Sequence, residues 1–148
     1  MAGIATLVAT LVAGVVLGLL LKRRDGRIRA VEQAPVTSGD LGADLGERAT
    51  LVQFSTAFCQ PCRATRRILD EVAGLVPGVR HVEIDAESRL DLVRRFDVLR
   101  TPTVLVLDGA GNVVKRASGQ PRKVDVIAAL GAAVDGASHG PSHPADKV

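Results

Sequence analysis

The sequence predicts an α/β fold in which helices cover both faces of a central, mixed β-sheet. Three observations support this prediction. Along most of the chain, segments with strand-like alternation follow segments whose apolar residues recur at helical spacing. The chain has 148 residues, which is enough for one modest domain with its own core. Apolar residues make up 47% of the chain, a larger share than is typical of disordered proteins.

The first 21 residues carry no charge and predict a single N-terminal transmembrane helix. A helix of this length spans roughly 31 Å, about the thickness of a hydrocarbon core. One alternative is a buried helix of a globular domain, which would normally show a polar stripe. The other is a cleaved secretion signal, which would begin with basic residues. Gly14 and Gly18 form a GxxxG motif, which is a weak signal for helix pairing.

A basic cluster follows the apolar run directly. Residues 22–29 contain five basic residues and one acidic residue, so they carry +4, and the rest of the +3 chain sums to −1. We therefore expect residues 22–26 to be a basic juxtamembrane segment, with the N-terminus outside and the domain in the cytoplasm. A domain outside the cytoplasm is the alternative. The net positive charge is confined to this cluster, and aromatic residues make up only 2% of the chain. Both observations argue against nucleic acid as a partner.

We expect the domain to occupy residues 27–134. A short strand is plausible at residues 27–32, and the turn formers of residues 35–47 predict a loop with one short helical turn. Residues 50–55 alternate as a strand. Residues 59–75 predict a helix, which the following Pro-Gly pair ends.

The second half of the domain continues the alternation. Residues 79–85 predict a strand, and residues 88–96 predict an amphipathic helix. Residues 103–107 and 112–118 predict two strands that flank a hairpin turn of sequence Asp-Gly-Ala-Gly.

The C-terminal part of the chain predicts one more helix and then a tail. Pro121 suits the first turn of a last helix over residues 121–134. Residues 135–148 are rich in Gly, Ser, His, Pro and charge, and they predict a disordered tail.

The only two cysteines, Cys59 and Cys62, stand at the junction of a predicted strand and a predicted helix. A disulfide that closes so short a loop adds little stability, and a disulfide scaffold would carry more cysteines. The first cysteine falls at the helix N-terminus, where free N–H groups and the helix dipole favour a thiolate. Pro61 suits the first turn because it lacks an N–H group. We therefore predict a redox pair in which Cys59 attacks a disulfide and Cys62 resolves the mixed disulfide.

Two other interpretations of the cysteines stay open. Together with His139 and His143 they form CxxC plus HxxxH, as in a zinc site, but 76 residues separate the pairs, against about a dozen in a zinc finger. The other interpretation is a pair of inert buried cysteines. We expect neither a metal nor an organic cofactor.

Two segments and one glycine resemble the thioredoxin family. Residues 51–63, LVQFSTAFCQPCR, resemble its buried strand and the C-x-P-C motif at a helix start. Residues 100–104, RTPTV, look like its Thr-Pro-Thr segment, and Gly119 matches a glycine near its active site. The resemblance covers about residues 27–134 and implies a thioredoxin-like fold. It also implies a cis peptide bond before Pro102, with the backbone of Thr101 pairing with substrate.

Four positions depart from the family pattern. Phe58 stands where the family usually has Trp, and Gln60 replaces the common Gly. Gln53 stands where thioredoxins place a buried Asp that is thought to relay the proton of the second cysteine, and an amide cannot titrate. His81 occupies the position of the Lys that partners this Asp. We therefore treat Gln53 and His81 as a candidate proton-transfer environment, and a satisfied strand histidine is the alternative for His81.

The sequence thus predicts a thiol–disulfide oxidoreductase that reduces protein disulfides at a membrane surface. The resemblance implies a thioredoxin reductase or another dithiol protein as electron donor. One alternative is an extracytoplasmic oxidoreductase for envelope disulfides or cytochrome maturation, and another is a non-catalytic module that binds a membrane partner. The residues expected to shape the substrate groove are Phe58, Gln60, Pro61, Thr101, Pro102 and Gly119.

Overall fold

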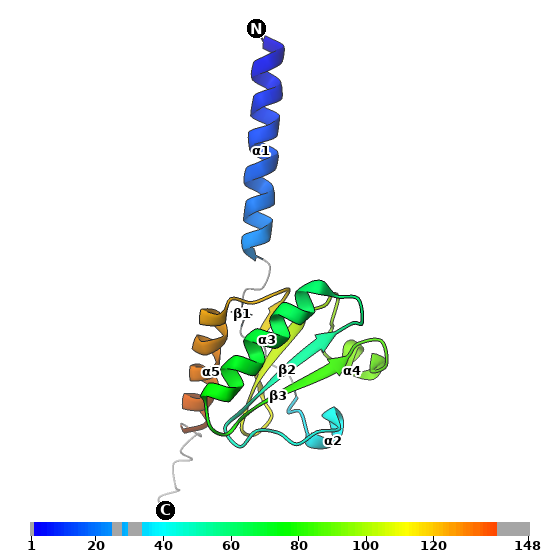
Figure 1. Ribbon diagram of the computed structural model, residues 1–148, viewed down its shortest axis with the longest axis vertical. Coiled ribbons are helices and arrows are strands. Elements are labelled where there is room, and N and C mark those ends of the chain that lie inside the picture. Colours follow the sequence, from blue (N-terminus) through cyan, green and yellow to red (C-terminus); the bar gives the residue numbers. More distant parts are fainter. Residues whose placement is uncertain (1, 25–27, 30–33, 139–148) are drawn as a thin grey trace, which may run out of the picture.

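The computed structural model describes residues 2–24, 28–29 and 34–138 (Figure 1). In these residues, five strands form one mixed sheet in the order β1-β5-β4-β2-β3. The central strand β2 (Ala49–Ser55) pairs parallel with β3 (Val79–Asp85) and antiparallel with β4 (Thr103–Asp108). β5 (Val113–Ser118) runs antiparallel to β4, and the two-residue β1 (Ile28–Arg29) pairs antiparallel with β5 at the edge. The predicted mixed sheet is confirmed.

Helices cover both faces of the sheet, as predicted. α3 (Gln60–Leu75) and α5 (Lys123–Ser138) pack on one face, where they share a core with alternate residues of β2 and β4 (Figure 1). The short α2 (Ser38–Leu41) and α4 (Leu90–Arg95) contribute to a second core on the other face.

The two cores divide the sheet residues by their alternation along each strand. Leu51 belongs to the first core and its neighbour Val52 to the second, since successive strand side chains point to opposite faces. All seven residues of β2 are buried, as expected for a central strand between two helical layers. The end of β2 leads directly into the cysteine pair.

Both predicted boundaries of the last helix change. The carbonyl of Arg122 accepts bonds from the amides of Asp125 and Val126, so α5 begins at Lys123 and Pro121 precedes it. α5 continues to Ser138, so the prediction of a disordered tail from residue 135 is wrong for residues 135–138. The rest of the predicted tail, residues 139–148, lies outside the described residues.

The N-terminal segment forms a helix, α1 (Ala2–Arg24), which extends away from the sheet in Figure 1. Its described apolar side chains are exposed, Leu7 to 67% and Leu11 to 63%. Over the described residues, however, no helix is both long and apolar enough to cross a membrane. The predicted transmembrane span over residues 1–21 is therefore not supported. Absence of charge predicted a helix correctly, but it does not by itself establish that the helix crosses a membrane.

Candidate functional site

Cys59 and Cys62 form a disulfide at the start of α3, with 5.2 Å between their Cα atoms. Cys59 is the N-cap residue of the helix, and the backbone N–H of Cys62 donates a hydrogen bond to its Sγ at 3.2 Å. Cys62 is only 2% exposed, whereas Cys59 is partly exposed. This placement makes the sulfur of Cys59 accessible to a partner protein, whereas the buried Cys62 can react only with Cys59. The two roles themselves remain predictions.

Gln53 lies in β2 beneath the first turn of α3 and is fully buried. Its Nε2 donates to the backbone carbonyl of Cys62 at 2.8 Å and to Oγ of Ser55 at 2.9 Å. These bonds tie β2 to the cysteine-bearing turn. Its Oε1 and Oγ1 of the buried Thr65 are left without a hydrogen-bond partner among the described residues.

His81, the second candidate for proton transfer, lies in β3 with a side chain that is 7% exposed. Its Nδ1 hydrogen-bonds Oδ1 of Asp70 on α3 at 2.5 Å, and its Nε2 is buried without a partner among the described groups. It makes no hydrogen bond with Gln53, so the structure does not join the two candidates directly. Their part in proton transfer stays a prediction.

Glu83, which the sequence analysis missed, is the cross-strand neighbour of Gln53 in the parallel β2–β3 pair. Its carboxylate accepts two hydrogen bonds from Arg66, at 2.6 and 2.7 Å. Burial raises the pKa of Glu83, but hydrogen bonds from Arg66 and Ser55 outweigh burial and hold that pKa below its ordinary value. The site therefore contains an ionised carboxylate one strand away from the neutral amide. Aligning the ends of the two predicted strands would have placed Glu83 beside Gln53.

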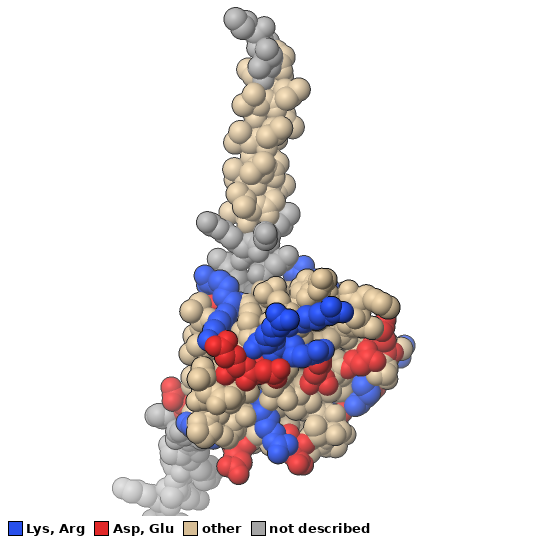
Figure 2. All heavy atoms as spheres, in the orientation of Figure 1, with Lys and Arg blue, Asp and Glu red and all other residues tan. Residues whose placement is uncertain are grey.

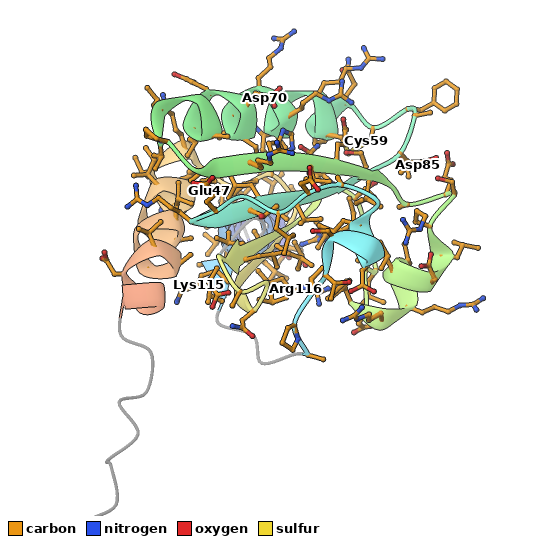
Figure 3. All side chains as sticks on the ribbon, turned by 90° about the horizontal axis from the view of Figure 1, so that it is seen from below. Glu47, Cys59, Asp70, Asp85, Lys115 and Arg116 are labelled. Atoms are coloured by element: carbon orange, nitrogen blue, oxygen red, sulfur yellow. A yellow bond between two sulfur atoms is a disulfide. The ribbon has the colours of Figure 1, made fainter. Side chains whose placement is uncertain are left out.

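A cleft of about 340 Å³ opens on the β3 side of the cysteine pair. Figure 3 shows Cys59 and Asp85 at the same end of the molecule. Charged residues of both signs line the cleft: Arg63, Arg66, Glu83, Asp85 and Glu87.

The segment predicted to shape a substrate groove lies on the opposite side of the cysteine pair. The Thr101–Pro102 peptide bond is cis, as the family resemblance implied. Oγ1 of Thr101 lies 3.3 Å from Oγ1 of Thr56. The carbonyl of Pro102 accepts a hydrogen bond from Gly119 at 2.7 Å, and Gly119 has a φ of 91°, which favours glycine.

A groove of about 540 Å³ separates this segment from Pro61. Pro61, Thr101, Pro102 and Gly119, four of the residues expected to shape a substrate groove, line it. That a substrate binds there stays a prediction. The other two predicted residues do not line it: Gln60 is exposed, and the side chain of Phe58 is 96% exposed.

Within the described part of the chain, no cluster of three or more His, Cys, Asp or Glu side chains could hold a metal ion. His139 and His143 lie outside the described residues, so the zinc alternative is not tested. The disulfide joins a partly exposed Cys59 to a buried Cys62, so an incoming thiolate can reach the pair at Cys59 and exchange with it.

Comparisons with known proteins agree on one family. A family model described as Thioredoxin matches residues 38–132. A thioredoxin of Staphylococcus saprophyticus is 26% identical over 89 residues, which cover 60% of this chain and 86% of the relative. A bifunctional thioredoxin reductase/thioredoxin of Mycobacterium leprae is 28% identical over 95 residues, which cover 62% of this chain and 20% of the relative.

Solved structures show the same fold. Thioredoxin-2 from the malaria parasite, described as a component of its protein secretion machinery, superposes with a TM-score of 0.54 at 18% identity, over 70% of this chain and 98% of that one. A mutant thioredoxin of Halobacterium salinarum gives a TM-score of 0.56 at 16% identity, over 70% and 88% of the two chains. At such low identity these two structures support the fold alone.

Proposed function

The chain belongs to the thioredoxin family, and on this premise we propose that it reduces protein disulfides by dithiol–disulfide exchange through Cys59 and Cys62. One observation carries the proposal, namely the Cys59–Cys62 disulfide at the start of α3. A pair that closes this bond reversibly can take two electrons from a donor and pass them to a substrate.

The exchange proceeds in two steps, in each of which one S–S bond breaks and another forms. The thiolate of Cys59 attacks one sulfur of the substrate disulfide, the substrate S–S bond breaks, and the leaving sulfur takes up a proton. Cys62 then loses its proton and attacks Sγ of Cys59, so that the mixed disulfide breaks and the second substrate thiol leaves. The substrate gains two electrons, and the chain ends with the Cys59–Cys62 disulfide.

Two features of α3 support Cys59 as the attacking group. The hydrogen bond from the N–H of Cys62 reaches its sulfur, and the N-terminal end of the helix dipole favours negative charge there. The partial exposure of Cys59 gives a substrate access to that sulfur, whereas Cys62 is buried.

For the electron donor we propose a thioredoxin reductase, with another dithiol protein as the alternative. The name of the mycobacterial relative joins the two activities in one chain, which supports this choice.

For the location we propose a membrane surface, with the domain on the cytoplasmic side. The exposed apolar side chains of α1 and the basic residues at its end support the proposal. A domain outside the cytoplasm, serving envelope disulfides or cytochrome maturation, is the alternative. A fluorescent protein that matures only in the cytoplasm, fused to the C-terminus, distinguishes the two: fluorescence supports our orientation, and its absence from an expressed fusion contradicts it.

Insulin reduction with dithiothreitol as donor tests the activity. We expect steady turnover by the wild type, none by Cys59→Ser, and accumulation of mixed disulfides by Cys62→Ser, because the second variant can attack but cannot resolve. Wild-type protein alkylated in its reduced form is the control and should be inactive. Full turnover by Cys59→Ser would contradict the assignment of roles, and absence of wild-type turnover would favour a non-catalytic binding module.

A further inference from the structure

The groove between α3 and the cis-proline segment has apolar walls and basic edges. Proline rings and one isoleucine form the walls, and two arginines stand at the edges. No Asp or Glu is among the described residues that line it. The wall residues are Pro61, Ile68, Pro102 and Pro121, and the edge residues are Arg100 and Arg122.

Both edge arginines are placed to meet a ligand. Arg100 is exposed and donates to the carbonyl of Ser118 at 3.4 Å. The side chain of Arg122 is 79% exposed and pairs with Asp125. The hydrogen bonds to Asp125 raise the pKa of Arg122 above its ordinary value, so its charge persists. Nε and Nη2 of Arg122 bond both carboxylate oxygens of Asp125, and Nη1 of the exposed guanidinium group can donate to a second carboxylate brought by a partner.

Two large apolar side chains project from the same end of the domain. Phe58, which directly precedes Cys59, is 96% exposed, and Leu99, which directly precedes Arg100, is 85% exposed. Scattered exposed apolar residues are ordinary, but here both adjoin residues of the site. Aromatic and aliphatic contacts beside the reactive sulfur suit a protein partner.

The linings on the two sides of the cysteine pair differ in net charge. On the β3 side, Glu83 is paired with Arg66, while Asp85 and Glu87 form no ion pair among the described residues. Figure 2 shows basic side chains gathered over α3. Arg63 and Arg66 of this helix line the same β3-side cleft, so that its lining carries three carboxylates and two guanidinium groups. The described lining of the groove carries two guanidinium groups and no carboxylate. An acidic partner segment therefore meets a net positive lining in the groove and a lining of net charge −1 in the β3-side cleft, a difference that favours the groove.

We propose that the groove selects extended protein segments in which acidic residues flank the reactive cysteine. The exchange part of this inference rests on the proposed function, whereas binding in the groove does not. Apolar walls bury the backbone and small side chains of such a segment, and its carboxylates meet Arg100 and Arg122 at the edges.

Three oxidised peptides, each with a single intramolecular disulfide, test the preference. They differ only in the residues beside the cysteine, which are two Glu, two Gln or two Lys. With the full chain at low salt, we expect kcat/KM for the Glu peptide to exceed that for the Gln peptide roughly 5–10-fold, and the Lys peptide to be slowest. At about 0.5 M salt the advantage should fall to within about twofold, because screening shortens the reach of exposed charges.

Variants assign the preference to the groove. Arg100→Gln and Arg122→Gln should each lower kcat/KM for the Glu peptide by a larger factor than kcat/KM for the Gln peptide, and so remove a large part of the Glu advantage. Arg100→Lys should keep most of the Glu advantage, because it keeps the positive charge. This result distinguishes an effect of charge from a structural effect of replacing Arg100. Arg80→Gln is the matched control, since Arg80 is exposed at the start of β3, at the far end of the sheet from Cys59, and it should change nothing.

Binding separates this inference from the proposed function. In a second set of peptides Ser replaces each Cys, and their affinity for the oxidised chain is measured by fluorescence anisotropy. Tighter binding of the Glu peptide, lost in the two Gln variants, supports the inference even if no peptide is reduced. Equal affinities for the Glu, Gln and Lys peptides, or an advantage unchanged in Arg100→Gln and Arg122→Gln, would overturn it, whatever the rate of reduction.

Discussion

Gln53 illustrates how far single residues can be understood from the sequence. The sequence showed that Gln53 stands where the family places a titratable Asp. It did not show the hydrogen bonds of Gln53 to Ser55 and to the carbonyl of Cys62. The same holds for His81, whose partner Asp70 lies on another element. The position of the CxPC residues at the start of α3 was predictable because it follows from local signals for a helix start. Partners across elements depend on strand register and helix rotation, which only the folded chain fixes.

Replacing Gln53 by Asp should change how the mixed disulfide is resolved. The new carboxyl group would be buried against the carbonyl of Cys62 and beside Glu83, and both burial and like charge raise a carboxyl pKa. We expect the resolving step to speed up near neutral pH and to gain a pH dependence within about pH 6–9. We also expect a loss of stability of about 1–3 kcal/mol from the lost hydrogen bonds.

Stopped-flow reduction of a labelled disulfide peptide measures this step. Gln53→Asn is the matched control, because it shortens the side chain without adding a titratable group. Identical rates and pH profiles for wild type and a folded Gln53→Asp variant would show that position 53 does not limit proton transfer.

The short elements show why boundaries are harder to predict than the elements themselves. The predicted helical turn within residues 35–47 is confirmed as α2, and it begins in a capping box of Thr37 and Asp40. The helix predicted over residues 88–96 is confirmed but shorter, at Leu90–Arg95. It ends where Asp97 adopts a φ of 48°, a left-handed conformation that periodicity does not reveal.

The capping box predicts an acid-sensitive contribution to stability. A backbone hydrogen bond from Thr37, with help from Thr37 Oγ1 and Arg95, lowers the pKa of Asp40 from 3.8 to about 2. A lowered folded-state pKa means that this contribution is complete above about pH 4 and is lost as the pH falls toward 2. Asp40→Asn should therefore be less stable than wild type at pH 6, and the difference should shrink toward pH 2.

Urea unfolding at pH 6, 4, 3 and 2 measures the difference in the free energy of unfolding. Asp44→Asn is the control, because that side chain is 84% exposed and its carboxylate lies 3.8 Å from Arg80. A deficit in Asp40→Asn that is the same at all four pH values would contradict the role of the carboxylate.

At the scale of the whole molecule, the sequence predicted the class of fold but could not order the sheet. Alternation along the chain identified the four longer strands, but their spatial order β5-β4-β2-β3 depends on where each connection crosses the sheet. The composition of the first 21 residues predicted the N-terminal helix correctly. The same composition did not establish that this helix crosses a membrane. Both cores draw on residues from Val36 onward, and none of the described side chains of α1 contributes to them.

Deleting residues 1–24 should therefore leave a folded and active domain. We expect its Tm to match that of the full chain within about 3 °C, because the deletion removes none of the described core residues. Equal insulin turnover per mole is the second expectation. A longer deletion, of residues 1–48, is the informative comparison, since it also removes the buried Val36 and Leu41 and should unfold the domain. Aggregation of the shorter deletion, without exchange activity, would contradict this domain boundary.

The Cys59–Cys62 disulfide also gives the molecule an optical property. The chain contains neither Trp nor Tyr and only three Phe, so the disulfide is its one near-ultraviolet chromophore beyond the weak phenylalanine bands. Reduction removes that chromophore, and near-ultraviolet circular dichroism then reports the redox state of the unlabelled protein. Intrinsic indole fluorescence cannot do so, because Phe58 stands where the family usually carries its tryptophan.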